Sequence, residues 1–164
     1  MFRCGTLGIS CGAMQAMTGI SWVGPFTVEA MLRGCCDRDH PKPPESSSVY
    51  VVSLHPWAGC PTSSAGILYV GGNTGSGMRF RTRIGDLIAD LFGFYTDTTG
   101  HHSGGYSLHR HCEANGLDPM TLRIGWAEHA PCGRCLEVEM VQALMPLLNK
   151  KRPPACRLPE CGSR

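Results

Sequence analysis

Charged residues are scarce in this sequence: aspartate, glutamate, lysine and arginine make up 17% of its 164 residues. The formal net charge of +2 is too small to indicate a nucleic-acid-binding protein from composition alone. No apolar stretch approaches the length that a membrane-spanning helix requires, so no membrane partner is expected. No internal repeat is visible either, and the length favours a single domain.

A secretory signal is also not evident. Residues 1–30 are mildly apolar, but glycine, serine, threonine, glutamine and tryptophan interrupt them, and only Arg3 supplies an early positive charge. Ten cysteines are many for this length. Without a secretory signal they favour reduced thiols over a disulfide framework, and we expect a cytoplasmic protein.

Glycine and proline, by contrast, are abundant, with 21 and 12 residues, and both favour turns and loops. In residues 1–47 helical periodicity is faint, and residues 39–44 form a linker rich in helix breakers. We expect residues 1–47 to be a disordered or loosely attached arm, followed by one ordered domain over residues 48–149. Residues 150–164 form a basic tail that contains cysteine and proline.

Two strands are predicted at the start of the ordered domain. Residues 49–54 and 67–70 are rich in β-branched and aromatic residues, and each run ends at a turn-forming pair. Strands this close in sequence usually pair antiparallel. In that pairing Tyr50 and Tyr69 can lie on one face, although tyrosines in strands are ordinarily just half-buried packing residues.

Apolar residues at helical spacing predict the helices that follow, and alternation predicts one more strand. The predicted helices cover residues 83–91, 107–115 and 132–148, and the third strand covers residues 120–126. The order β-β-α-α-β-α predicts an α+β fold, with a small antiparallel three-stranded sheet flanked by helices.

The last predicted helix contains two glutamates, which helical geometry separates. Val141, Leu144 and Leu148 lie on the line through Glu137, whereas Glu139 points to water. A carboxylate that faces a core is costly unless a divalent cation or an arginine compensates it. Taken alone, the pattern favours a simpler interpretation, an ion pair in the N-terminal turn of the helix.

Together with the tyrosines, this helix resembles the GIY-YIG nucleases, the module of excision-repair, homing and certain restriction endonucleases. The resemblance covers about residues 48–149. The matching motifs are Ser48-Val49-Tyr50, Tyr69-Val70-Gly71, and Leu136-Glu137 followed by Pro146 and Asn149. Two positions depart from the family pattern: Ser48 replaces a glycine, and Leu87 stands where many members carry a histidine.

The resemblance implies an endonuclease that hydrolyses DNA phosphodiester bonds. Glu137 would hold a single Mg²⁺ or Mn²⁺ ion, which polarises the scissile phosphate. Tyr50 would assist the attacking water, directly as a base or within a relay, and Tyr69 would help to order that water or the phosphate. No small-molecule organic cofactor is expected, and the oligomeric state stays open.

An arginine from the first helix of the domain would stabilise the charge on the phosphate oxygens. Arg79, Arg81 and Arg83 are all candidates. Arg83 is favoured because an arginine followed by an aliphatic residue at the start of an amphipathic helix is similar to the family pattern, and Arg79 is the second choice.

Further nucleic-acid contacts are expected from positive and polar residues near these motifs. A run of lysines after the last helix is ordinarily a solvated helix end, but beside a nuclease site it becomes a candidate phosphate contact. The candidates are Arg79, Arg81, Arg110, Asn149, Lys150 and Lys151. The alternative function is a catalytically inactive nucleic-acid-binding or interaction module on the same scaffold.

Cysteines and histidines give a third possibility. Cys132 and Cys135 form a C-x-x-C motif, and Cys156 and Cys161 form a wider pair after it. A four-thiolate zinc site is conceivable, within a zinc-stabilised redox or structural module, but small buried thiols are the simpler interpretation. His101-His102 with His109 and His111 could ligate a metal, but around a glycine-rich turn they are rather expected to cap a helix, bind phosphate or face water.

Overall fold

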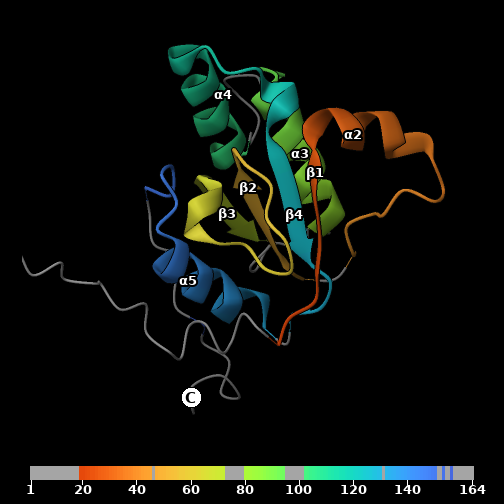
Figure 1. The fold of residues 1–164 in the computed structure, drawn as a ribbon, viewed down its shortest axis with the longest axis vertical. Coiled ribbons are helices and arrows are strands. Elements are labelled where there is room, and N and C mark those ends of the chain that lie inside the picture. Colours follow the sequence, from red (N-terminus) through yellow and green to blue (C-terminus); the bar gives the residue numbers. More distant parts are fainter. Residues whose placement is uncertain are drawn as a thin grey trace, which may run out of the picture.

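A computed structural model describes residues 19–45, 47–72, 80–94, 102–130 and 132–150, together with Pro153 and Cys156. In this part of the chain four strands form one antiparallel sheet in the order β1-β4-β2-β3, and four α-helices pack around it (Figure 1). The α+β architecture matches the expectation, but the prediction of a three-stranded sheet is wrong.

The additional strand, β1 (Trp22–Thr27), pairs antiparallel with β4 (Arg123–Ala127). It comes from the segment that was expected to lie outside the domain, and the first 18 residues of that segment lie outside the described residues. Gly24-Pro25 interrupts the strand pattern in the sequence, and the pairing register shifts around it. Proline has no N–H to donate, and it is tolerated here because β1 is an edge strand.

The predicted antiparallel pair is confirmed. β2 (Val49–Ser53) lies between β4 and β3 (Ile67–Gly72), and every residue of β2 is buried. The register places Tyr50 opposite Gly71 and Tyr69 opposite Val52. Residues opposite each other in such a pair share a face, so both tyrosines project from the same side of the sheet.

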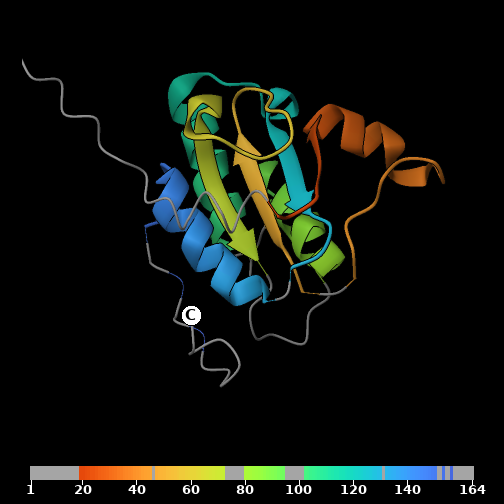
Figure 2. The same ribbon diagram turned by 60° about the horizontal axis from the view of Figure 1, so that its bottom comes forward.

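Helices cover both faces of the sheet, which gives three layers (Figure 2). One core joins Tyr50 and Val52 to the helices that follow β1 and β3, and the other joins Val49 and Val51 to the last helix. The helices are α2 (Val28–Arg33), α3 (Phe80–Leu91), α4 (Ser103–Asn115) and α5 (Gly133–Leu144), with short 3-10 turns at Gly34–Cys36, Ser63–Ala65 and Pro119–Thr121. Among the described residues, no helix has the length and apolar character needed to cross a bilayer.

Helix α5 ends four residues before the predicted boundary at Leu148. Met145 adopts a left-handed conformation with φ 46°, and Pro146 follows it, so the helix cannot continue. The chain then runs beside β3: the N–H of Leu147 donates to Ile67 O at 3.2 Å, and that of Leu148 to Leu68 O at 2.9 Å. This segment therefore covers the outer edge of the sheet.

Candidate active site

Tyr50 and Tyr69 lie side by side where the start of β2 meets the end of β3, with their ring centroids 6.2 Å apart. Gly71 makes this arrangement possible, because a Cβ at that position would overlap the Tyr50 hydroxyl and the Tyr69 ring. Tyr50 has no exposed surface, whereas Tyr69 is partly exposed. Tyr69 is therefore the phenol that solvent reaches, and Tyr50 supports it from within the core.

His102 contacts both tyrosines and was not expected there. Its Nε2 lies 2.8 Å from the Tyr50 hydroxyl oxygen, and its ring centroid is 6.1 Å from that of Tyr69. Its Nδ1 accepts hydrogen bonds from the N–H groups of Gly104 and Gly105, so of the predicted roles helix capping is confirmed for His102, whereas His101 lies outside the described residues. Because Nδ1 is the acceptor, a neutral ring carries its proton on Nε2 and donates it to Tyr50.

Gly104 and Gly105, which follow His102, leave room for this close packing. A Cβ at Gly104 would overlap the Tyr69 ring, and one at Gly105 would press on the backbone of Leu87. Leu87 itself is fully buried in the core. The imidazole of His102 thus reaches the tyrosines from the N-cap of α4, whereas Leu87 of α3 packs in the core.

Glu137 approaches the same end of the sheet from α5. The carboxylate lies against Gly72, where an added Cβ would be 3.1 Å from Glu137 Oε2. Its side chain is half-buried, and it faces the sheet as the helical pattern predicted. The nearby Ser48 hydroxyl donates to Ala127 O at 2.6 Å, which ties the start of β2 to the end of β4 and gives this serine a structural role.

Of the two candidate arginines among the described residues, Arg83 is the one near the tyrosines. Its charge acts on Tyr50, Tyr69 and His102, and its buried Nε has no hydrogen-bond partner among the described residues. Arg81 instead donates to Pro43 O at 2.9 Å and pairs with Glu45 at 3.6 Å. Arg79 lies outside the described residues.

Burial dominates the electrostatics of the site. It raises the pKa of Tyr69 to about 12, with a further increase from Glu137 that Arg83 opposes. The pKa of Tyr50 is raised well above its ordinary value, again chiefly by burial. Burial and then the charge of Arg83 lower the pKa of His102 to about 3. Both phenols are therefore protonated and the imidazole is neutral at neutral pH.

Asn149, an expected nucleic-acid contact, is bound to the protein backbone instead. Its Oδ1 accepts from Val70 N at 2.9 Å, and its Nδ2 donates to Val70 O at 2.8 Å. The amide thus pairs with edge strand β3 as a neighbouring strand would. This geometry favours anchoring over the predicted contact with nucleic acid. Lys150 next to it is exposed, and Lys151 lies outside the described residues.

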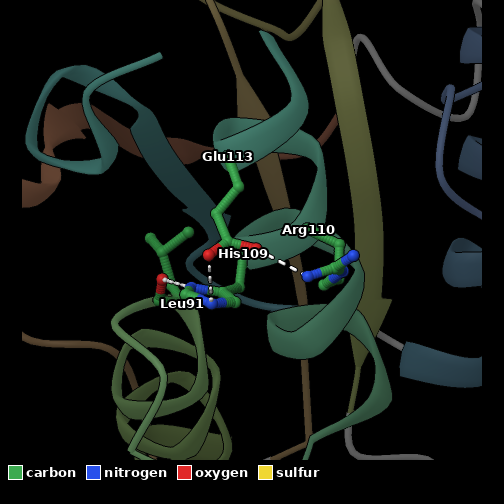
Figure 3. Close-up of polar contacts among 4 residues, drawn as sticks. All are labelled: Leu91, His109, Arg110 and Glu113. Atoms are coloured by element: carbon green, nitrogen blue, oxygen red, sulfur yellow. Dashed lines mark hydrogen bonds and ion pairs between the residues drawn. The ribbon is translucent and has the colours of Figure 1, made fainter. Parts of the chain in front are cut away.

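Arg110, another expected contact, is paired within α4. Its Nη1 donates to Glu113 at 2.8 Å, and the other carboxylate oxygen of Glu113 lies 3.5 Å from His109 Nε2 (Figure 3). His109 in turn bonds the carbonyl oxygen of Leu91 through Nδ1 at 3.0 Å. The hydrogen bond of His109 links the end of α3 to α4. The ion pair between Arg110 and Glu113 is exposed, and such a pair contributes little to stability.

An apolar groove of about 580 Å³ lies elsewhere, between α2, the 40–43 segment and α3. Its lining includes Met31, Ile88 and Phe92 and none of the tyrosines, His102 or Glu137.

Comparisons with protein-family models, curated proteins and solved structures find no match for this chain. A functional assignment therefore depends on the residues that meet at the start of β2 and the end of β3.

Proposed function

We propose that this chain is a metal-dependent endonuclease that hydrolyses DNA phosphodiester bonds and is similar to the GIY-YIG nucleases. The supporting observation is that two phenols, an arginine and a carboxylate from four different elements meet at one end of the sheet. These residues are Tyr50, Tyr69, Arg83 and Glu137. DNA is the proposed partner, and the proposed location remains cytoplasmic.

The residues fit a hard divalent cation. Glu137 offers a half-buried carboxylate beside neutral phenols, and one carboxylate with several waters is the coordination that magnesium favours. When bound there, Mg²⁺ or Mn²⁺ would polarise the scissile phosphate and stabilise the leaving oxygen.

The side chains would then act as donors to the phosphate and the water. Arg83 lies close enough to both phenols for its charge to act on them, and the planar guanidinium suits phosphate oxygens. Tyr69, protonated and partly exposed, would donate from its hydroxyl to the water or the phosphate. Tyr50 accepts from His102, which leaves its own hydroxyl proton for another acceptor in the relay.

Plasmid cleavage tests this proposal. Supercoiled DNA is incubated with the full chain in Mg²⁺, Mn²⁺, Ca²⁺ or EDTA, with Tyr69→Phe and Glu137→Ala as variants. Nicking by the wild type in Mg²⁺ or Mn²⁺ is expected, with a reduced rate in Tyr69→Phe and none in Glu137→Ala. Nicking that persists in Glu137→Ala would overturn the mechanism.

A non-catalytic nucleic-acid-binding module is the second candidate, and the full burial of Tyr50 favours it. A phenol without exposed surface and with a raised pKa is a poor base in this conformation. DNA binding without cleavage in every divalent ion would support this candidate over the nuclease.

A further inference from the structure

Three cysteines come together at the start of α5, apart from the tyrosines. Cys132 is the N-cap of the helix, Cys135 lies in its first turn, and Cys156 arrives from the segment that follows the domain. Their sulfur atoms all lie within 4.8 Å of one another. Each residue is only partly buried, so the interpretation as small buried thiols is wrong for these three.

The sulfur spacing suits a metal ion. Cys132 Sγ and Cys156 Sγ are 3.6 Å apart. Thiolates bound tetrahedrally to zinc at about 2.3 Å lie about 3.8 Å from one another, whereas a disulfide needs about 2.05 Å. A disulfide joins only two sulfur atoms, so it would leave the third cysteine of this cluster unexplained. The spacing of the three sulfurs is therefore compatible with three ligands of one tetrahedral zinc ion.

The backbone around the cluster favours anionic sulfur. The N–H of Cys135 donates to Cys132 Sγ at 3.4 Å, in the first turn of α5. Backbone N–H groups and the positive end of the helix dipole stabilise thiolates, and the thiolate is the form that binds metal. The C-x-x-C spacing on a tight turn is common in structural zinc sites.

We propose that Cys132, Cys135 and Cys156 bind one Zn²⁺ ion as a structural site. Cys161, the fourth cysteine considered from the sequence, lies outside the described residues and is not assigned to the site. The proposal does not depend on nuclease activity, because the three thiols and their spacing stand apart from the tyrosines.

The position of the site gives zinc a structural consequence. Cys135 lies two residues before Glu137, and between the two cysteines Gly133 packs closely on Ser47, where a Cβ would be 2.6 Å from the serine Oγ. A metal held there ties the segment that contains Cys156 to the start of α5. The same bond would fix the turn from which Glu137 projects.

Metal analysis of the full chain, purified reduced from zinc-supplemented medium, tests the proposal. One equivalent of zinc per chain is expected. Single substitutions Cys132→Ser, Cys135→Ser and Cys156→Ser should each lower the zinc content severalfold, whereas Cys60→Ser, a comparably exposed cysteine elsewhere, should leave it unchanged. A zinc-selective chelator with Mg²⁺ in excess should lower the Tm of the wild type by at least about 5 °C.

Cobalt gives a measurement that does not require the variants to fold. Co²⁺ replacing zinc in the wild-type chain should give thiolate-to-cobalt absorption in the near ultraviolet and the visible bands of a tetrahedral ion. A reduced wild-type chain that binds neither metal, or zinc content unchanged in all three variants, would overturn the site. A Cys132–Cys156 disulfide recovered without metal would also overturn it.

Discussion

His102 connects the stability of the protein to pH at the scale of a single residue. Its pKa is lowered to about 3 by burial first and Arg83 second, whereas an unfolded histidine titrates near pH 6.5. At a pH between these two pKa values, His102 binds a proton in the unfolded chain but not in the folded chain. The free energy of unfolding therefore decreases as the pH falls, by up to about 1.4 kcal/mol per pH unit, and is independent of this residue above pH 6.5.

Urea unfolding of the wild type and of His102→Gln between about pH 7 and pH 4 measures this effect. Other groups titrate in both proteins, so the difference between the two slopes isolates His102. The wild type is expected to lose stability more steeply than the variant. Equal slopes would show that His102 accepts a proton readily and is not held neutral beside Tyr50.

Gly104 and Gly85 form a matched pair of helical glycines with opposite expected outcomes. A Cβ at Gly104 would overlap the Tyr69 ring, whereas a Cβ at Gly85 meets open space. Gly85→Ala should stabilise the protein by about 0.5–1 kcal/mol through helix propensity. Gly104→Ala should destabilise it by about 1–3 kcal/mol and displace Tyr69. Thermal unfolding measures the stability change in each variant. Equal changes in the two variants would contradict the close packing of Gly104 on Tyr69.

Individual site residues were predictable where a motif marks them. Tyr50, Tyr69 and Glu137 follow from strand and helix patterns together with the family resemblance, and the structure brings them to one end of the sheet. His102 was not predictable as a neighbour of the tyrosines, because its contact with them depends on how α4 packs on α3. The bond between Arg81 and Pro43 joins residues 38 positions apart, so local sequence patterns could not show that Arg81 is occupied by a backbone oxygen.

At the scale of elements, the segment after α5 acts as an additional edge for β3. Asn149→Ala removes both side-chain hydrogen bonds to Val70, and should destabilise the protein by about 1–3 kcal/mol because the strand loses its partners. Lys150→Ala, one residue later and exposed, should change stability by less than about 0.5 kcal/mol. Chemical denaturation of the two variants measures the contrast. A stable Asn149→Ala with weakened DNA binding would restore the sequence-based expectation.

The strands and helices inside residues 48–149 were largely predictable, because their apolar periodicity agrees with their tertiary environment. β1 was not, since Gly24-Pro25 interrupts its pattern and only pairing with β4 makes it a strand. The end of α5 was predicted too late because Leu147 continues an apolar spacing although it is 64% exposed. Pro146, which follows the left-handed Met145, was the local signal for an earlier end, because the residue before a proline is disfavoured in a helix.

At the scale of the whole molecule, the three-layer arrangement places candidate side chains from both faces of the sheet at one of its ends. The tyrosines project from the face that α3 and α4 cover, and Glu137 comes from α5 on the other face (Figure 1). Gly71 and Gly72 at the end of β3 leave room for both approaches. The proposed nuclease site therefore depends on the docking of α5 as well as on the two strands.

Weak dependence on salt is expected for DNA binding by this molecule. The net charge is +2, Arg110 is paired with Glu113, and Arg81 with Glu45. Two of the expected phosphate contacts are therefore already paired within the described residues, and each phosphate contact contributes about 0.9 to the slope of log K against log salt concentration. A slope of about 2–4 is predicted from fluorescence anisotropy with a short duplex. A slope near 8 would reveal a basic surface that these residues do not supply.

Glu137 gives the most direct test of the proposed nuclease. Glu137→Gln and Glu139→Gln remove the same charge from the same helix, but only Glu137 lies against Gly72 at the end of the sheet. Single-turnover cleavage in Mg²⁺, with DNA affinity measured in Ca²⁺, separates chemistry from binding. Glu137→Gln should cleave at least about a hundredfold more slowly with little change in affinity, and Glu139→Gln should stay within about threefold of the wild type. Equal rates in the two variants, or no cleavage by the wild type, would contradict the proposed role of this carboxylate.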